Sequence, residues 1–280
     1  MKIAITGAGG FVGSALANAA RARGDDVIAV PRGGTHFGGA DAVVHLAGAP
    51  IAVRWTAARK KEIRDSRVLG TQRVAEAIAT SIVKPRVFVC ASAIGFYGNR
   101  GDEVLTETSG TGSDFLAGVV RDWEAAAAGA TGARVVQLRF GIVLSPDGGA
   151  LAKMLLPFRM GAGGRLGAGT QWMSWIGLHD LVRVILFAID NASLVGAYNA
   201  TSPNPVTNAD FSATLGVVLH RPAIVPVPEF SLKLMFGEMA EGAMLASQRV
   251  LPARLHAAGF QFEDAELADA LRHELDLAQI

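Results

Sequence analysis

The chain has 280 residues, of which 50% are hydrophobic and 18% charged, and its formal net charge is +1. This length allows a large core. The near-neutral net charge gives no electrostatic attraction to nucleic acid or to a membrane surface. The single cysteine, Cys90, lies in an apolar strand pattern and excludes an internal disulfide or a multi-cysteine metal site. No apolar run reaches the ~18 residues of a membrane span, and a strand pattern stands where a signal peptide would, so we expect a soluble cytoplasmic protein.

The N-terminus combines a strand, a glycine turn and a helix. The apolar residues 3–6 precede Gly7, Gly10 and Gly13, spaced GxxGxxG, and the pattern becomes helical from Phe11. The first glycine permits a sharp turn, the second lets backbone N–H groups approach a pyrophosphate, and the third lets the helix pack closely on the strand. A tight turn without a ligand is the alternative, but the context favours a bound dinucleotide whose phosphates lie at the helix N-terminus.

The second strand ends beside an arginine. Residues 11–23 are expected to form a helix, and residues 26–31 a strand followed by Arg32. In nucleotide-binding α/β units an acid at this point binds the ribose 2′-OH, whereas an arginine accommodates a 2′-phosphate. No acid follows until Asp41, so the sequence favours NADP over NAD, with a solvated loop arginine as the alternative.

The link after this strand is short. Residues 33–40 are too few for a crossover helix, which needs at least ~10–12 residues, and residues 42–48 already form the next strand pattern. We therefore expect the strand at 26–31 to be an edge, or to be flanked only by a vestigial strand.

Strands and helices then alternate. Helices are expected at 56–81 and 115–128, and strands at 86–92 and 134–144. This order predicts a doubly wound parallel sheet of the Rossmann type with right-handed crossovers.

Beyond residue 145 the elements become shorter and more mixed. We expect helices at 149–160, 179–190 and 208–220, strands at 172–176 and 197–200, a proline-bounded edge strand at 222–228, and a mainly helical tail from residue 230. The sequence thus divides into an NADP-binding Rossmann domain at 1–147, to whose sheet later segments return, and a small mixed α/β substrate lobe with a C-terminal helical extension at 148–280.

Several stretches together resemble a known superfamily. TGAGGFVG, HLAGAPI, SAIGFYG, LRFGIVL and WIGLHDL resemble the extended short-chain dehydrogenases/reductases. More narrowly, RWTAARKKEIRDSRV, LLPFRMGAGG and GEMAEGAML resemble an atypical subgroup of NAD-dependent epimerase/dehydratase-like proteins of unknown substrate, sometimes labelled cell-division inhibitors. The likeness spans nearly the whole chain.

The resemblance implies an NADP(H) site. By matching motif it places the pyrophosphate on the glycine turn, the adenosine phosphate on the arginine after the second strand, and the nicotinamide near the LRFGIVL strand. The residues that the resemblance implies for the NADP(H) site are Gly7, Gly10, Phe11, Val12, Gly13, Arg32, Leu46, Ala47, Glu62, Arg67 and Ile142. Spacing alone favours an ordinary exposed helical face for Glu62 and Arg67, and core packing for Ile142.

The chain departs from the family at the catalytic pair. Extended members use a tyrosine and a lysine spaced YxxxK, in which the lysine lowers the tyrosine pKa. Neither Tyr97 nor Tyr198 has a lysine four residues on, and the matching positions hold Phe115 and Val119. Ser92 remains, as a strand-end hydroxyl or a substrate contact.

The candidate catalytic residues are therefore Ser92 and Tyr97, and the histidines show no metal-ligand spacing. We expect an NADP(H)-dependent oxidoreductase acting on a small polar carbonyl or hydroxyl compound, held near Trp172 and Trp175, although for each tryptophan taken singly core packing is favoured. The alternative is a non-catalytic NADPH sensor or regulatory module. The substrate, the direction of reaction and the oligomeric state, homo-oligomer included, stay open.

Overall fold

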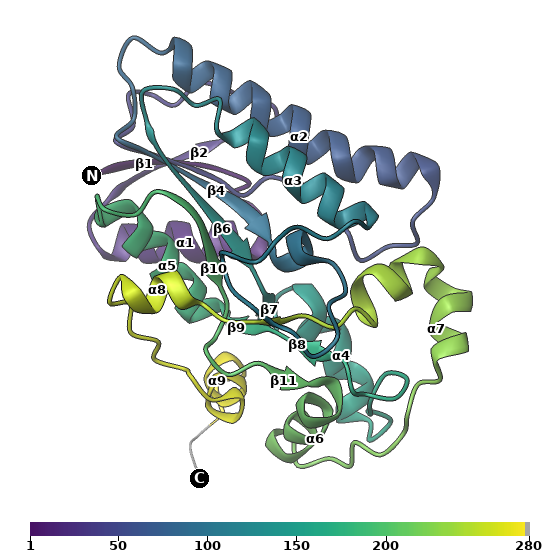
Figure 1. The fold of residues 1–280 in the computed structure, drawn as a ribbon. Coiled ribbons are helices and arrows are strands. Elements are labelled where there is room, and N and C mark those ends of the chain that lie inside the picture. Colours follow the sequence, from purple (N-terminus) through teal and green to yellow (C-terminus); the bar gives the residue numbers. More distant parts are fainter. Residues whose placement is uncertain (278–280) are drawn as a thin grey trace.

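The computed structural model describes residues 1–277, and a parallel sheet forms their centre. Its six strands run in the order β10-β6-β4-β3-β1-β2 (Figure 1). They are β1 (Lys2–Thr6), β2 (Asp26–Val30), β3 (Ala42–His45), β4 (Val87–Ala93), β6 (Arg134–Phe140) and β10 (Gly196–Ala200). The expected Rossmann-like α/β fold is confirmed.

Helices cover both faces of this sheet. Helices α1 (Phe11–Ala22) and α5 (Leu178–Asp190) pack on the face that receives Ile3 and Ile5. Helices α2 (Ala57–Thr80) and α3 (Phe115–Ala127) pack on the opposite face with Ala4. The alternation of side chains along each strand gives the sheet two apolar faces, so it is buried on both sides.

Strand β2 is the edge strand, as the sequence predicts. Among the described residues 1–277 it pairs only with β1, and residues 31–41 hold neither strand nor helix. Phe37 and Ala40 of this link are buried against the sheet, which fixes the short connection to β3.

The expected strand 134–144 is wrong in one respect, because it is two strands. After β6 ends, β7 (Ile142–Leu144) pairs with β9 (Trp175–Gly177) in a separate sheet. Gly141 makes the bend where the chain passes Ser174, whose carbonyl oxygen would lie 2.7 Å from a Cβ on this glycine. The expected strand 172–176 divides likewise into β8 (Trp172–Met173) and β9.

The expected edge strand at 222–228 is also wrong. An isolated bridge joins Val227 to Leu166, and the N–H groups of Val225 and Val227 donate to the Gly163 and Arg165 carbonyls at 3.1 and 2.9 Å. The prolines at 222, 226 and 228 have no N–H to donate, so this pairing does not extend into a strand. The remaining short strands are β5 (Val104–Leu105), β11 (Val206–Thr207) and β12 (Arg249–Val250).

Short helices make up the rest of the C-terminal half, as expected for the tail. They are α4 (Gly149–Arg159), α6 (Asn208–Val218), α7 (Glu229–Phe236), α8 (Ala253–Ala257) and α9 (Leu267–Glu274), with a π turn at Ala240–Met244. In the N-terminal half, a 3₁₀ turn at Ile94–Tyr97 follows β4. Within residues 1–277, no helix has the length and apolar character to cross a membrane. The domain boundary at residue 147 stays a prediction, although β10 and α5, from beyond it, complete the sheet and one helix layer.

Candidate functional site

The glycine turn after β1 is packed so closely that side chains would not fit. Gly7 has φ +76°, and the N–H of Gly10 donates to its carbonyl oxygen at 3.0 Å. A Cβ on Gly13 would lie 2.1 Å from the same oxygen, and one on Gly7 would lie 2.9 Å from the Ala47 nitrogen. Gly7 therefore makes the turn and Gly13 allows the close packing that the sequence assigns to them, and the approach of a pyrophosphate at Gly10 stays a prediction.

The turn leads into an uncapped helix N-terminus. Gly10 is the N-cap of α1, it supplies no side-chain hydrogen bond, and the first turn holds no acidic residue. Backbone N–H groups at Phe11 and Val12 are thus among the donors that a helix start leaves without an intrahelical partner. A bare helix start beside a glycine turn fits a phosphate group.

The end of β3 forms the other wall of this turn. The N–H of Leu46 donates to the Thr6 carbonyl at 3.1 Å, and Ala47 lies against Gly7. Just before them, His45 Nδ1 and Thr6 Oγ1 share a hydrogen bond of 2.6 Å, and burial lowers the pKa of His45 to about 4. The structure therefore brings Leu46 and Ala47 to the glycine turn.

Arg32 lies just past the carboxyl end of β2, the neighbour of β1. It is exposed, and its guanidinium makes no hydrogen bond or ion pair within residues 1–277. Its charge is available to an anion at the edge of the sheet where ligands of such folds bind.

Arg67 of α2 reaches the loop after β3. Its Nη1 donates to the Ala49 and Ile63 carbonyls at 3.0 and 3.3 Å, and its Cζ would lie 3.4 Å from a Cβ on Gly48. Burial lowers the pKa of Arg67 to about 10, and no carboxylate within residues 1–277 forms an ion pair with it. A largely buried cation with only carbonyl partners is suited to a negatively charged ligand.

Two other implied residues lie apart from this cation. Glu62 is exposed and accepts a hydrogen bond from Arg59 at 2.5 Å, so the structure places it on the outer face of α2. Ile142 opens β7, one residue beyond the β6 bend, and its N–H donates to the Ser174 carbonyl at 2.8 Å. It is half-buried at the carboxyl edge of the sheet. The cofactor contacts of both stay predictions.

The two candidate catalytic hydroxyls belong to one internal network. Ser92 Oγ donates to Glu124 Oε1 at 2.6 Å, and Arg139 forms a bidentate pair with the same carboxylate at 2.8 Å for both contacts. Arg139 Nη1 also donates to the Tyr97 hydroxyl at 3.0 Å, and that hydroxyl donates to Asn199 Oδ1 at 2.7 Å.

This network has consequences for proton transfer. Tyr97 has no exposed surface, and burial raises its pKa above the ordinary value of a tyrosine. The Ser92 proton is directed at Glu124, and the catalytic roles of Ser92 and Tyr97 stay predictions. Sequence reasoning missed Glu124, Arg139 and Asn199; the one available signal was a charge inside the apolar strand VVQLRFGIVL.

The positions of the family's tyrosine and lysine are apolar. Phe115 packs edge-on against Trp55 with ring centroids 5.3 Å apart, and Val119 is buried. Trp175 is fully buried and donates to the Asn204 carbonyl, so its place is the core. Trp172 is half-buried and donates to Asp102.

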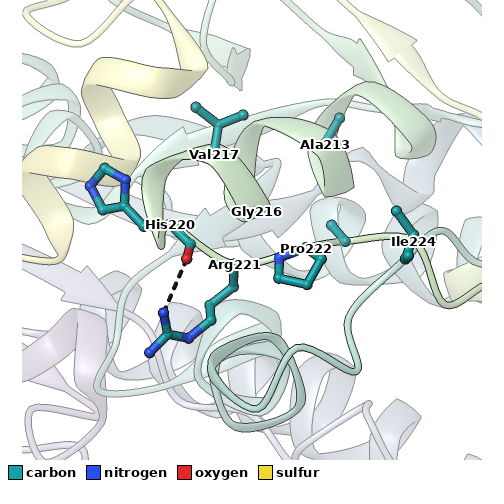
Figure 2. A pocket seen from close by; sticks show the side chains of 8 residues that line it. Ala213, Gly216, Val217, His220, Arg221, Pro222 and Ile224 are labelled. Atoms are coloured by element: carbon teal, nitrogen blue, oxygen red, sulfur yellow. Dashed lines mark hydrogen bonds between the residues drawn. The ribbon is translucent and has the colours of Figure 1, made fainter.

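Two surface hollows lie outside the glycine turn. One of about 560 Å³ is formed by the end of α6 and the following loop, where Arg221 donates to the His220 carbonyl (Figure 2). A second, of about 350 Å³, lies between Tyr97–Arg100 and residues 111–114. Within residues 1–277, no group of three His, Cys, Asp or Glu side chains could hold a metal ion.

Comparison with known proteins gives a consistent family. Residues 34–200 match the model of the NAD dependent epimerase/dehydratase family, and residues 227–274 match a domain of unknown function (DUF1731). An Arabidopsis thaliana chloroplastic epimerase family protein, an SDR39U1 homolog, is 40% identical over 97% of this chain and 86% of its own. An epimerase family protein of Mycobacterium bovis is 41% identical over 96% of each chain. The crystal structure of human epimerase family protein SDR39U1 with NADPH has a TM-score of 0.94 at 34% identity, covering 99% of both chains.

Proposed function

The chain belongs to the NAD dependent epimerase/dehydratase family, and we propose that it binds NADP(H) and transfers hydride to or from a small polar carbonyl or hydroxyl compound. The observation that carries this proposal is the bare N-terminus of α1 behind a glycine turn that excludes side chains. When bound, the nicotinamide would supply the hydride chemistry.

Different residues around the glycine turn would bind different parts of the cofactor. Gly7 to Gly13 would hold the pyrophosphate through backbone N–H groups, and Leu46 and Ala47 would contact the cofactor along the opposite wall. A negatively charged group of the cofactor would be the counterion of the buried Arg67 guanidinium. These assignments rest on the geometry of the glycine turn and of the loop after β3.

The choice of NADP(H) over NAD(H) rests on Arg32. An exposed guanidinium without an internal partner, at the end of β2, suits the adenosine 2′-phosphate. The NADPH in the human relative's structure supports the same choice.

A second candidate function is a non-catalytic module that responds to NADPH. Two observations favour it: the Ser92 and Tyr97 hydroxyls are both engaged inside the protein, and Phe115 stands at the position of the family's tyrosine. Turnover of a panel of carbonyl compounds with NADPH separates the two candidates, because the module would bind the cofactor without oxidising it.

The first prediction tests the cofactor. A charge-assisted hydrogen bond is worth about 1.5–3 kcal/mol, so Arg32→Ala should weaken NADPH binding about 10- to 100-fold and change NADH binding little. Nicotinamide fluorescence titrations measure both affinities. Arg86→Ala, an exposed arginine just before β4, is the matched control and should bind both cofactors normally. Equal losses of NADPH and NADH affinity in Arg32→Ala would show that Arg32 does not read the phosphate.

A further inference from the structure

A C-terminal segment covers the start of α2. Residues 229–244 comprise α7, a turn at Gly237 and the π turn, and Figure 1 shows this segment below the beginning of α2 and the loop that leads into it. Arg54 Nη1 donates to the Leu234 and Met235 carbonyls at 2.8 and 3.4 Å, at the negative end of the α7 dipole. We call residues 229–244 the cover.

An ion pair and an apolar cluster hold the cover in place. Lys60 Nζ contacts both carboxylate oxygens of Glu238, at 2.7 and 2.9 Å. Beneath this pair, Met239 is buried together with Trp55. A Cβ on Gly242 would lie 2.8 Å from the Trp55 ring, so the π turn rests directly on the indole.

Within the cover, α7 is weakly anchored. Leu232 is the one buried residue of α7, whereas Phe230 and Leu234 are 72% and 73% exposed. Gly237 adopts φ +59°, a conformation that gives the chain a sharp turn between α7 and the π turn. Elements with few buried apolar contacts are those that open at low free-energy cost.

The same face of α2 joins the cover to the candidate cofactor loop. Lys60, Ile63 and Arg67 follow the i, i+3, i+7 spacing of one helical face. Lys60 Nζ lies 4.5 Å from the centroid of Phe115, and the Arg67 guanidinium lies 5.3 Å from the Trp123 ring, so both cations lie over aromatic side chains of α3.

The loop between β3 and α2 makes a second connection. Ala49 accepts a hydrogen bond from Arg67 and donates its N–H to Ser66 Oγ at 3.0 Å. Two residues on, the Ile51 carbonyl accepts the Trp55 indole N–H at 2.9 Å. A ligand that orders Arg67 and Ala49 therefore orders the supports of the cover as well.

We propose that residues 229–244 form a cofactor-responsive cover, which NADP(H) stabilises in the closed position through Arg67, the 46–55 loop and the Lys60–Glu238 ion pair. The proposal rests on the cofactor binding proposed above. Thermodynamic reciprocity requires that a ligand which favours the closed cover is itself bound more tightly when the cover closes well.

Hydrogen exchange read by mass spectrometry tests this. Saturating NADPH should slow exchange in peptides covering residues 7–13 and also in those covering 229–244. In K60Q and in E238Q the slowing at 229–244 should be lost, and the dissociation constant of NADPH should rise about two- to fivefold, as expected for an exposed ion pair. The charge swap K60E/E238K should restore both.

The matched control is K61Q, which removes the neighbouring exposed Lys61–Asp65 ion pair of the same helix and should behave as wild type. Slowed exchange at 7–13 with unchanged exchange at 229–244 in the wild type would overturn the cover alone. Unchanged exchange at both segments would overturn the cofactor proposal and the cover with it. K61Q matching K60Q would show that the ion pair has no specific role.

Discussion

At the scale of single residues, the sharpest constraint is the missing side chain of Gly13. A Cβ there would meet the Gly7 carbonyl at 2.1 Å, whereas one on Gly9, in the same turn, would meet nothing within 4 Å. Overpacking typically costs about 1–3 kcal/mol, so Gly13→Ala should lower the free energy of unfolding by that amount and abolish NADPH binding. Gly9→Ala is the matched control. Urea unfolding and fluorescence titration measure the two effects; equal behaviour of the two variants would contradict the close-packed turn.

His45 predicts a pH dependence of stability. Burial lowers its pKa from 6.5 to about 4, so between these values the unfolded chain binds a proton that the folded chain does not. Stability is then fully present above pH 6.5 and falls as the pH drops towards 4. The shift predicts a loss of about 2 kcal/mol between pH 7.5 and pH 5.

Urea unfolding at the two pH values checks this contribution. His45→Gln should lose about 2 kcal/mol less than wild type over that interval, whatever its stability at pH 7.5. Exposed His256→Gln should follow the wild-type pH profile. His273 cannot mimic the effect: its pKa is raised by the Asp264 hydrogen bond against the opposing effect of burial, so its contribution is lost as pH rises. Parallel profiles for His45→Gln and wild type would contradict the assignment.

Which residues could be predicted from sequence depends on how local their surroundings are. The glycine turn could be predicted from the sequence because its strand, turn and helix are contiguous. Cys90 was readable too: it is buried, and burial raises its pKa to about 12. The environment of Tyr97 was not readable, because its partners Arg139 and Asn199 come from β6 and β10, far along the chain. A hydroxyl in a polar loop gives no signal of such partners.

At the scale of elements, periodicity predicted helices and central strands to within a few residues, because each buries one apolar stripe or two apolar faces. Periodicity failed to predict where a strand ends when backbone contacts between distant segments set that end. The bend at Gly141 exists because the chain passes the Ser174 carbonyl, and an apolar run gives no sign of that contact. The run at 222–228 has strand composition, but its prolines limit it to a bridge.

At the scale of the whole molecule, the carboxyl edge of the sheet brings together groups that the sequence keeps far apart. Ser92 lies near the end of β4, Arg139 lies near the end of β6, and Asn199 lies in β10. Their shared network ties the last strand of the sheet to the candidate catalytic residues. Strand β10 therefore both completes the sheet and fixes the hydroxyl of Tyr97, which the sequence placed in the active site.

This arrangement predicts the direction of any reaction. Epimerisation by transient oxidation needs a base for the substrate hydroxyl, and a positioned acid or base is typically worth ~10²–10⁴ in rate. Phe115 and Val119 supply none, and burial raises the pKa of Tyr97, which keeps its phenol neutral at pH 7. A neutral phenol cannot accept a proton, and to donate one to a reduced carbonyl the buried Tyr97 hydroxyl would first have to leave its acceptor, Asn199 Oδ1.

We therefore expect slow, NADPH-dependent reduction of simple carbonyl compounds and no epimerisation of sugar nucleotides. Loss of nicotinamide absorbance measures the first, and chromatography of sugar nucleotides incubated with NADP⁺ measures the second. Tyr97→Phe, assayed with its unfolding curve, tests the proton donor: a slower reaction at unchanged stability keeps Tyr97 in that role, and an unchanged rate removes it. Fast epimerisation by the wild type would contradict the prediction, because it would require a base that the positions of the family's tyrosine and lysine do not provide.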